Sequence, residues 1–307
     1  MLGALINMRA GCARRDPDLV QRLSDLLGAG RVEATGSEDE ITAALERLRS
    51  AGVEWLALVG GDGTFTGTLT QLLRCWPRDA WPAIVVTRGG TVNTIATALG
   101  ARGTPRQTIQ SLLEGARPSE TRRELLRVHA GERPARVGFI FGMGAATRWL
   151  DAYYAEPVQG PWTATRLVAR TLGSGAVQGR FAREVFEPFE AKLVLDGQTQ
   201  GEMQFTLLGA ATIREVGLGF QPFLSAGTEP GRFHLLHTDA PPARFALELP
   251  YAHGGTTGAL SVLSHHSVAE AELDLPVPQP WMLDADVQPA ARQLRIDLTP
   301  ALRFLSA

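Results

Sequence analysis

Two glycine-rich loops hold the residue types most suited to chemistry in this sequence. The loop GGDGT occupies residues 60–64 after the apolar run 53–59, and the loop GGTVN occupies residues 89–93 after the apolar run 83–86. Each loop leads into apolar residues at helical spacing. A loop between a strand and a helix can offer backbone N–H groups and the positive helix end to a phosphate, and glycine leaves room for that approach. The pattern favours a phosphate site with Asp62 as the carboxylate for a cation or a proton, but helix N-caps at Asp62 and Asn93 would explain the same residues.

The elements around these loops predict two domains. Strand and helix patterns alternate as far as residue 121, which is typical of a parallel sheet covered by helices. From residue 122 the pattern is that of strands joined by hairpin turns such as Asp196-Gly197. We expect an α/β, Rossmann-like domain over residues 1–121 and an all-β, antiparallel β-sandwich domain over residues 122–307, whose last ~15 residues could pack back on the first domain. The segment 153–183 is less regular and is expected to be a helix or a cover loop.

Composition removes several classes of protein. A net charge of −2 and a pI near 6.3 argue against nucleic acid as a partner. Lys192 is the one lysine, so a Walker A loop and a protein kinase, which both need a lysine near the phosphates, are excluded. Cys12 and Cys75 form no CxxC pair, which excludes a disulfide framework and a zinc signature and fits a cytoplasmic location.

The histidines give no sign of a metal site or a hydrolase. No HExxH and no GxSxG motif is present. His265-His266 is expected to be an exposed pair in a turn. His234 and His237 stand three apart in a strand pattern, so they are expected to point to opposite faces.

The ordered motifs resemble those of the diacylglycerol kinase and sphingosine kinase superfamily. In that family GGDGT is followed by P-x-GTxNxxA, and here GGDGT is followed by GGTVN and IATALG. The opening LINMRAG is similar to the family's first strand and nucleotide loop through Asn7 and Gly11, and Thr35 stands for the family's threonine. Near the other end, WMLDADVQP resembles the family's DGE motif at residues 284–286. The resemblance covers nearly the whole chain.

The resemblance implies transfer of the γ-phosphoryl group of ATP to a lipid hydroxyl, with Mg²⁺ as the second cofactor. The acceptor could be diacylglycerol, a sphingoid base or ceramide. Catalytic roles are implied for Asp62 and Asp286, which compete for that of general base, and metal binding for Asp62, Asp284 and Asp286. The residues expected to contact nucleotide are Asn7, Gly11, Thr35, Gly60, Gly61, Asp62, Gly63, Thr64, Gly90, Thr91 and Asn93.

Several residues depart from the family pattern and keep alternatives open. Ala285 and Asp286 replace the glycine and glutamate of DGE, and Thr94 stands where aspartate is frequent. Pro230 replaces an aspartate of the family's DDG segment, which implies loss of a structural Mg²⁺ found in many bacterial relatives. One alternative is a lipid-binding protein of the same fold with weakened catalysis. Another is NAD kinase, which shares GGDGT but should carry a GxLGFL stretch.

A lipid acceptor implies contact with a membrane. We expect a cytoplasmic protein that touches an anionic membrane surface peripherally, with a homodimer as a further option. The segment 160–175, which carries Trp162, Arg166 and Arg170, is the candidate contact, although an ordinary amphipathic cover helix would look the same.

Overall fold

The computed structural model describes residues 1–177, 179–248 and 261–307 and divides into two compact units. The first unit comprises residues 1–123 and 300–307, and the second comprises residues 124–299. Residues 300–307, at the end of the range expected for the second domain, therefore lie in the first unit. None of the helices in the described part combines the length and apolar character that crossing a bilayer requires.

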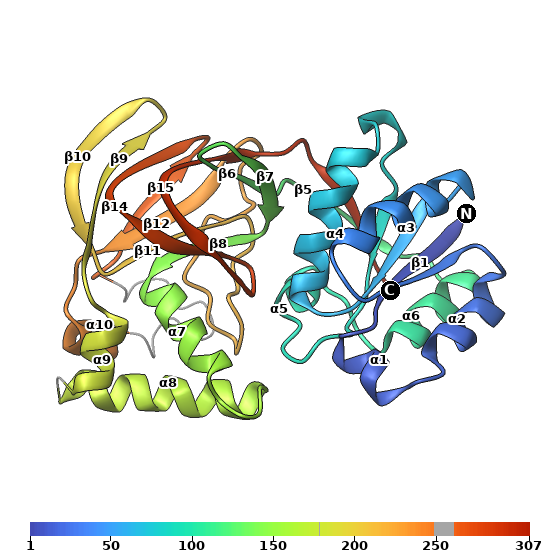
Figure 1. The fold of residues 1–307 in the computed structure, drawn as a ribbon, viewed down its shortest axis with the longest axis horizontal. Helices are drawn as coiled ribbons and strands as arrows, with labels where there is room; N and C mark the ends of the chain where they lie inside the picture. Colours follow the sequence, from blue (N-terminus) through green and yellow to red (C-terminus); the bar gives the residue numbers. More distant parts are fainter. Residues whose placement is uncertain (178, 249–260) are drawn as a thin grey trace. The chain divides into compact units, whose positions relative to one another are not determined.

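The first unit, which contains the labelled strands β1 and β5 and helices α1 to α6 in Figure 1, is built on a six-stranded sheet in the order β2-β1-β3-β4-β16-β5. Strands β1 to β4 and β16 run parallel, and β5 is antiparallel to β16. The strands are β1 (Leu2–Asn7), β2 (Val32–Thr35), β3 (Trp55–Val59), β4 (Ala83–Val86), β5 (Ser119–Arg123) and β16 (Leu302–Ser306). The helices are α1 (Gly11–Arg15), α2 (Leu19–Leu27), α3 (Asp39–Ser50), α4 (Asp62–Cys75), η1 (Arg78–Ala80), α5 (Thr94–Ala98) and α6 (Pro105–Leu113).

Both faces of this sheet are covered, which explains why its central strands are apolar throughout. On one face Leu23 of α2 and Ile109 of α6 pack against alternate residues of β1 and β3. Helices α3 and α4 contact each other and the same strands. Strand β16 completes the sheet beside β4 with Phe304 and Leu305 buried.

The second unit is a ten-stranded sheet whose described pairings are antiparallel. Its main path is β13-β12-β11-β8-β14-β15-β6-β7, and β9, which carries β10, pairs with the first part of β14. The strands are β6 (Leu126–Ala130), β7 (Arg133–Gly138), β8 (Ile140–Gly144), β9 (Phe189–Leu195), β10 (Gln198–Phe205), β11 (Leu207–Ala211), β12 (Phe233–Thr238), β13 (Ser264–Val268), β14 (Ala271–Leu283) and β15 (Asp286–Leu298). The predicted Asp196-Gly197 turn joins β9 to β10, with the positive φ angles of 47° and 76° that such a hairpin turn needs.

Strand β14 is long enough to pair with different strands at its two ends, and the sheet that results encloses one core. Its first residues pair with β9 and its last with β8, and the ladder to β15 is irregular between Asp274 and Trp281. Phe141, Phe205 and Trp281 lie in the resulting core cluster. The predicted combination of a parallel α/β domain with an antiparallel β domain is thus confirmed.

The described residues of the second unit form four helices: α7 (Ala145–Tyr154), α8 (Pro161–Ala176), α9 (Arg180–Val185) and α10 (Pro242–Glu248). The segment 153–183, predicted as a helix or a cover loop, therefore contains the end of α7, all of α8 and most of α9. The apolar residues between the arginines supply the reason, because Leu167 of α8 packs on Leu150 and Tyr153 of α7.

The prediction of a turn at His265-His266 was wrong, although His265 is exposed as expected. Both residues lie in strand β13, where His265 Nδ1 is 2.9 Å from Nε2 of His234 and His266 Nε2 is 3.2 Å from Nε2 of His237. The register of β12 with β13 places the two pairs on opposite faces of the sheet. The turn prediction failed because a short polar stretch has no recognisable period of its own, whereas the neighbouring strand β12 supplies the partners.

Candidate functional site

Three loops meet where parallel strands β1, β3 and β4 end in the first unit. The N–H of Gly89 donates to the carbonyl of Gly60 at 3.1 Å, and the N–H of Cys12 donates to the carbonyl of Gly89 at 3.0 Å. Asn7 Nδ2 donates to Oγ1 of Thr64 at 2.9 Å, which ties the end of β1 to the first turn of α4. The carboxyl edge of a parallel sheet is where open α/β folds bind ligands. The structure therefore brings both glycine loops and Asn7 together at that edge.

The glycines are needed because the two loops touch backbone to backbone. A Cβ on Gly90 would lie 2.4 Å from Cα of Gly61, and a Cβ on Gly89 would lie 2.7 Å from the nitrogen of Gly60. None of these four glycines has a positive φ angle. The structure therefore uses these glycines for the space that they leave and not for a left-handed backbone.

Asp62 links the first loop to the helix that follows the second. Its Oδ1 accepts the N–H of Ile95 at 3.0 Å, and its Oδ2 accepts the N–H of Thr94 at 3.1 Å. These are the first N–H groups of α5, so Asp62 satisfies the start of that helix rather than capping its own. Burial raises the pKa of the Asp62 carboxyl above its ordinary value, and the hydrogen bonds from Ile95 and Thr94 oppose that rise. Asp62 thus accepts the first N–H groups of a helix, as the N-cap alternative predicted, but that helix is α5 and not α4.

Asn93 closes the second loop on itself. Its Oδ1 accepts the N–H of Gly90 at 2.7 Å, and its Nδ2 donates to the carbonyl of Gly90 at 3.1 Å. Asn93 has a φ angle of 59°, and its side chain makes no capping bond to α5. The alternative in which Asn93 serves only as an N-cap is therefore not supported, because its side chain shapes the loop.

The first turn of α4 provides the anion-binding element. Gly61 is the N-cap residue and Asp62 is the first helical residue, so the N–H groups of Asp62 and Gly63 have no acceptor within the helix. The helix runs for 14 residues and places its positive end at the same loop. These N–H groups can hold a phosphate oxygen without any lysine.

The remaining predicted nucleotide residues of this unit surround that edge. Thr35 ends β2 and is buried, with its Oγ1 donating to the carbonyl of Ile6 at 3.4 Å. Gly11 begins α1, and a Cβ there would lie 3.9 Å from Oγ1 of the exposed Thr91. Thr35 thus has a packing role in the sheet, while Gly11 and Thr91 approach each other at the loop surface.

Asp284 and Asp286 belong to the second unit, at the turn between β14 and β15. Asp284 is buried with a φ angle of 54°, and its Oδ1 accepts the N–H groups of Phe139 and Ile140, both at 2.9 Å. Its own N–H donates to the carbonyl of Ile140 at 2.7 Å. Asp286 is half-buried and begins β15. Asp284 therefore fixes the turn that presents Asp286.

These contacts decide which carboxylates suit a cation. In the part of the chain that the structure describes, no three His, Cys, Asp or Glu side chains gather as a metal site. Asp284 does not fit the predicted ligand role, because its carboxylate is buried and used by the backbone. A carboxylate has about four lone-pair sites. Asp62 uses two of them for backbone N–H groups and one for the side chain of Thr94, so it still fits a cation shared with phosphate oxygens.

The segment around Pro230 contains a cationic side chain of its own. Arg232 donates to Oδ2 of Asp196 at 2.7 Å and to the backbone carbonyl of Ser267. Glu229 Oε2 accepts a hydrogen bond from the Oγ–H of Ser267 at 3.0 Å. The acidic groups of this segment are thus engaged by Arg232 and Ser267, which does not resemble a Mg²⁺ cage.

Several residues that shape the nucleotide edge were missed in the sequence. The backbone N–H groups of Thr94, Ile95 and Cys12 make the contacts between loops, and Oγ1 of Thr87 donates to the carbonyl of Leu58 at 2.5 Å. Backbone donors carry no signature in a residue type. A polar residue directly after an apolar strand was the one available signal for Thr87.

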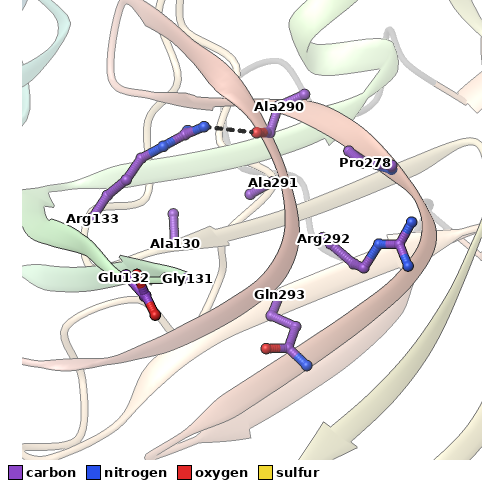
Figure 2. Close-up of a pocket in the computed structure, with 9 residues that line it drawn as sticks. All are labelled: Ala130, Gly131, Glu132, Arg133, Pro278, Ala290, Ala291, Arg292 and Gln293. Carbon is purple, nitrogen blue, oxygen red and sulfur yellow. Dashed lines mark hydrogen bonds between the residues drawn. The ribbon is translucent and has the colours of Figure 1, made fainter.

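A hollow of about 630 Å³ lies in the second unit beside the β6–β7 turn (Figure 2). Ala130, Pro278 and Ala291 are among the residues that line it. The Arg133 guanidinium at its rim donates to the carbonyl of Ala290 at 3.2 Å, as Figure 2 shows. None of the predicted site residues lines this hollow, and the backbone holds Arg133, one of its two arginines, so we do not assign the hollow a role.

Comparisons with known proteins agree with this geometry. A model of the diacylglycerol kinase catalytic domain matches residues 2–121. No curated protein matches the sequence. A candidate diacylglycerol kinase from Bacillus anthracis str. Sterne has a similar structure, with a TM-score of 0.71 at 14% identity, covering 100% of this chain and 95% of that one. An NAD kinase from Archaeoglobus fulgidus in complex with ATP gives a TM-score of 0.50 at 16% identity, covering 100% and 94% of the two chains. At these identities the structural similarities show the fold alone.

Proposed function

We propose that this chain, whose residues 2–121 match the model of the diacylglycerol kinase catalytic domain, transfers the γ-phosphoryl group of ATP to the hydroxyl group of a lipid. The resemblance seen in the sequence is confirmed by the match of the diacylglycerol kinase catalytic domain model to residues 2–121, and this match supports a kinase-type catalytic domain. The observation that carries the finer proposal is the pair of interlocked glycine loops beside the first turn of α4. That geometry supports a nucleotide phosphate site in a protein without a phosphate-binding lysine.

Within this proposal the first unit binds and orients ATP. The N–H groups at the start of α4 hold phosphate oxygens, and Asn7 and Asn93 keep the surrounding loops in place through Thr64 and Gly90. Mg²⁺, when bound with ATP, would neutralise charge that develops on the phosphoryl group, and Asp62 would hold it together with the phosphates. The fold similarity to an NAD kinase crystallised with ATP supports the choice of nucleotide.

We assign the proton transfer to Asp286 and not to Asp62. Both Asp62 oxygens accept backbone N–H groups at the positive end of α5, and these bonds favour the ionised carboxylate. A proton taken up by Asp62 would weaken them. Asp286 stands directly after the fixed Asp284 turn, where the family has its glutamate, and would accept the proton of the lipid hydroxyl.

Labelled-phosphate transfer tests the proposal directly. Purified protein with Mg²⁺ and γ-labelled ATP is offered diacylglycerol, monoacylglycerol, sphingosine, ceramide and NAD in parallel. We expect one lipid class to be labelled, and the Asp286→Asn variant to lower kcat about 10²–10⁴-fold. Asp286→Glu, which restores the family's longer side chain, should retain activity. Asp274→Asn is the matched control, because Asp274 is an exposed carboxylate on the neighbouring strand β14.

The alternatives have distinct outcomes in the same assay. Labelling of NAD with no lipid labelled would identify an NAD kinase. Binding of ATP with no acceptor labelled would identify a lipid-binding protein of the same fold. Equal kcat values for the wild type and Asp286→Asn would remove Asp286 from the mechanism.

A further inference from the structure

Helix α8 carries exposed apolar side chains on the side that does not face its unit. Trp162 is 81% exposed, Val158 just before the helix is 72% exposed and Val177 at its end is 77% exposed. Exposed tryptophan is uncommon on a surface that contacts only water, because its large ring is usually mostly buried. We call Val158, Trp162, Arg166, Arg170 and Val177 the α8 surface.

The other side of the same helix makes the structural contacts. Ala164 and Leu167 are buried against Leu150 and Tyr153 of α7, and α8 also contacts α9 and α10. In Figure 1, α8 lies at one end of the second unit with α7 and α9 on one side of it. The exposed ring of Trp162 is therefore not required to anchor the helix.

The spacing of the exposed residues produces one continuous stripe. Trp162, Arg166 and Arg170 follow each other at intervals of four residues, and exposed Ala169 and Gly173 lie on the same side. An apolar ring at the start, small residues in the middle and long cationic side chains between them can lie flat on a surface. A groove on a folded partner would instead fit a compact apolar patch.

The charge of this region has the opposite sign to the net charge of the whole chain. Residues 155–185 contain four arginines and two glutamates, and α8 itself contains no acidic residue, although the whole chain has a net charge of −2. Glu156 pairs with Arg166, and the Arg170 guanidinium lies 4.1 Å above the ring of Phe181. The α8 surface is thus positively charged and partly screened by one glutamate.

We propose that the α8 surface docks the protein onto an anionic lipid bilayer. This inference deepens the proposed function, on which its biological sense rests, by naming the surface that would bring the enzyme to its acceptor. Trp162, Val158 and Val177 enter the interfacial layer, where amphipathic rings are favoured. Arg166 and Arg170 contact the anionic headgroups.

Co-sedimentation with vesicles tests the docking without ATP or acceptor. One set of vesicles contains phosphatidylcholine alone, and the other contains an added fraction of phosphatidylglycerol. We expect the wild type to bind the anionic vesicles more tightly, and Trp162→Ser to lower the affinity about tenfold. Val277→Ser is the matched control, because Val277 is 62% exposed on β14 outside the α8 surface, and it should leave binding unchanged.

The ion pair between Glu156 and Arg166 allows a test with opposite signs. Arg166→Gln should weaken binding to the anionic vesicles about fivefold, and Glu156→Gln should strengthen it by a similar factor. Neither change should affect binding to phosphatidylcholine alone. Thermal unfolding of each variant should match the wild type, since the changed side chains are exposed or partly exposed at the surface.

The proposal is overturned if Trp162→Ser and Val277→Ser bind equally, or if the Glu156 and Arg166 variants shift affinity in the same direction. A wild type that phosphorylates a short-chain soluble lipid but does not bind vesicles would retain the proposed function and remove the docking surface. A wild type that binds vesicles through Trp162 but phosphorylates no lipid would retain the docking surface and remove the proposed function.

Discussion

Asp62 in the first unit and Asp284 in the second make the same kind of contact in different surroundings. Each carboxylate accepts hydrogen bonds from two consecutive backbone N–H groups of another segment of its unit. Asp62 is half-buried at a loop edge between the half-buried Gly61 and Gly63, and it uses both oxygens. Asp284 is buried between strands, and it uses one oxygen for both bonds. One contact therefore orders a loop that can receive a ligand, and the other fixes a hairpin.

The comparison shows that a carboxylate in a functional motif can be structural in one place and available in another. Burial decides the difference, since an aspartate enclosed by strands cannot offer its oxygens to a cation in solution. Asp284 is therefore a positioning residue for Asp286, whereas Asp62 keeps access to a ligand. Four changes of condition or sequence test this distinction.

Acid should destabilise the second unit more than the first, because all six histidines fall within residues 124–299. Burial, with a smaller effect of the neighbouring histidines, lowers the pKa of His234 and His237 to about 4. The unfolded chain then binds more protons below pH 6.5, so stability is full above that pH and is lost as the pH falls towards 4. At pH 5 the loss is about 2 kcal/mol for each of these two histidines.

Hydrogen exchange at pH 7 and pH 5, corrected for the intrinsic effect of pH, measures this loss unit by unit. Faster exchange in β12 and β13 with unchanged exchange in β1 and β3 is the expected result. His237→Gln should reduce the pH dependence. Equal loosening of both units at pH 5 would show that the histidine pairs do not govern the acid response.

Removing the Asp284 carboxylate should destabilise the second unit strongly. Asp284→Ala leaves two buried N–H groups without their acceptor and places alanine at a φ angle of 54°, so the free energy of unfolding should fall by about 3 kcal/mol. Asp284→Gly removes the same acceptor without the backbone strain and should cost less. Urea unfolding of both variants separates the two contributions. A loss below that of Asp62→Asn would contradict the assignment of Asp284 as the structural member of the pair.

Adding one methyl group at the loop contact should affect nucleotide binding. Gly90→Ala places a Cβ 2.4 Å from Cα of Gly61, so the loops must separate, at a cost of about 2 kcal/mol in stability and a clear loss of ATP affinity. Calorimetric titration with ATP measures the affinity. Gly173→Ala is the matched control, because that helical glycine has open space around it and should become slightly more stable. Unchanged ATP affinity in Gly90→Ala would place the nucleotide away from these loops.

Asp62→Asn should have the smallest effect on stability of these changes. The amide keeps one acceptor oxygen for α5 and loses the other at a half-buried position, so the free energy of unfolding should fall by about 1 kcal/mol. The Mg²⁺ concentration needed for half-maximal activity should rise at the same time, because the proposed cation ligand is lost. An unchanged Mg²⁺ dependence would indicate that Asp62 only holds the loops together.

The sequence by itself determined the local elements and the edge of the sheet at which we propose that nucleotide binds. Apolar periodicity located the helices of the first unit, and the Asp196-Gly197 turn located a hairpin, because neighbouring residues alone decide these features. The two glycine loops indicated one edge of a parallel sheet, since every parallel strand ends on the same side.

Only the tertiary structure decided how those pieces are held. Asp62 contacts residues 32 and 33 positions further along the chain, and Asp284 contacts residues 144 and 145 positions earlier. The pairing of His265 and His266 with β12 likewise depends on a neighbouring strand. Such contacts follow from how strands pair across long separations, which no local pattern encodes. The same reason explains why two similar motifs differ. The aspartate of GGDG in the first unit has an accessible carboxylate, whereas the first aspartate of LDAD in the second unit has an enclosed one.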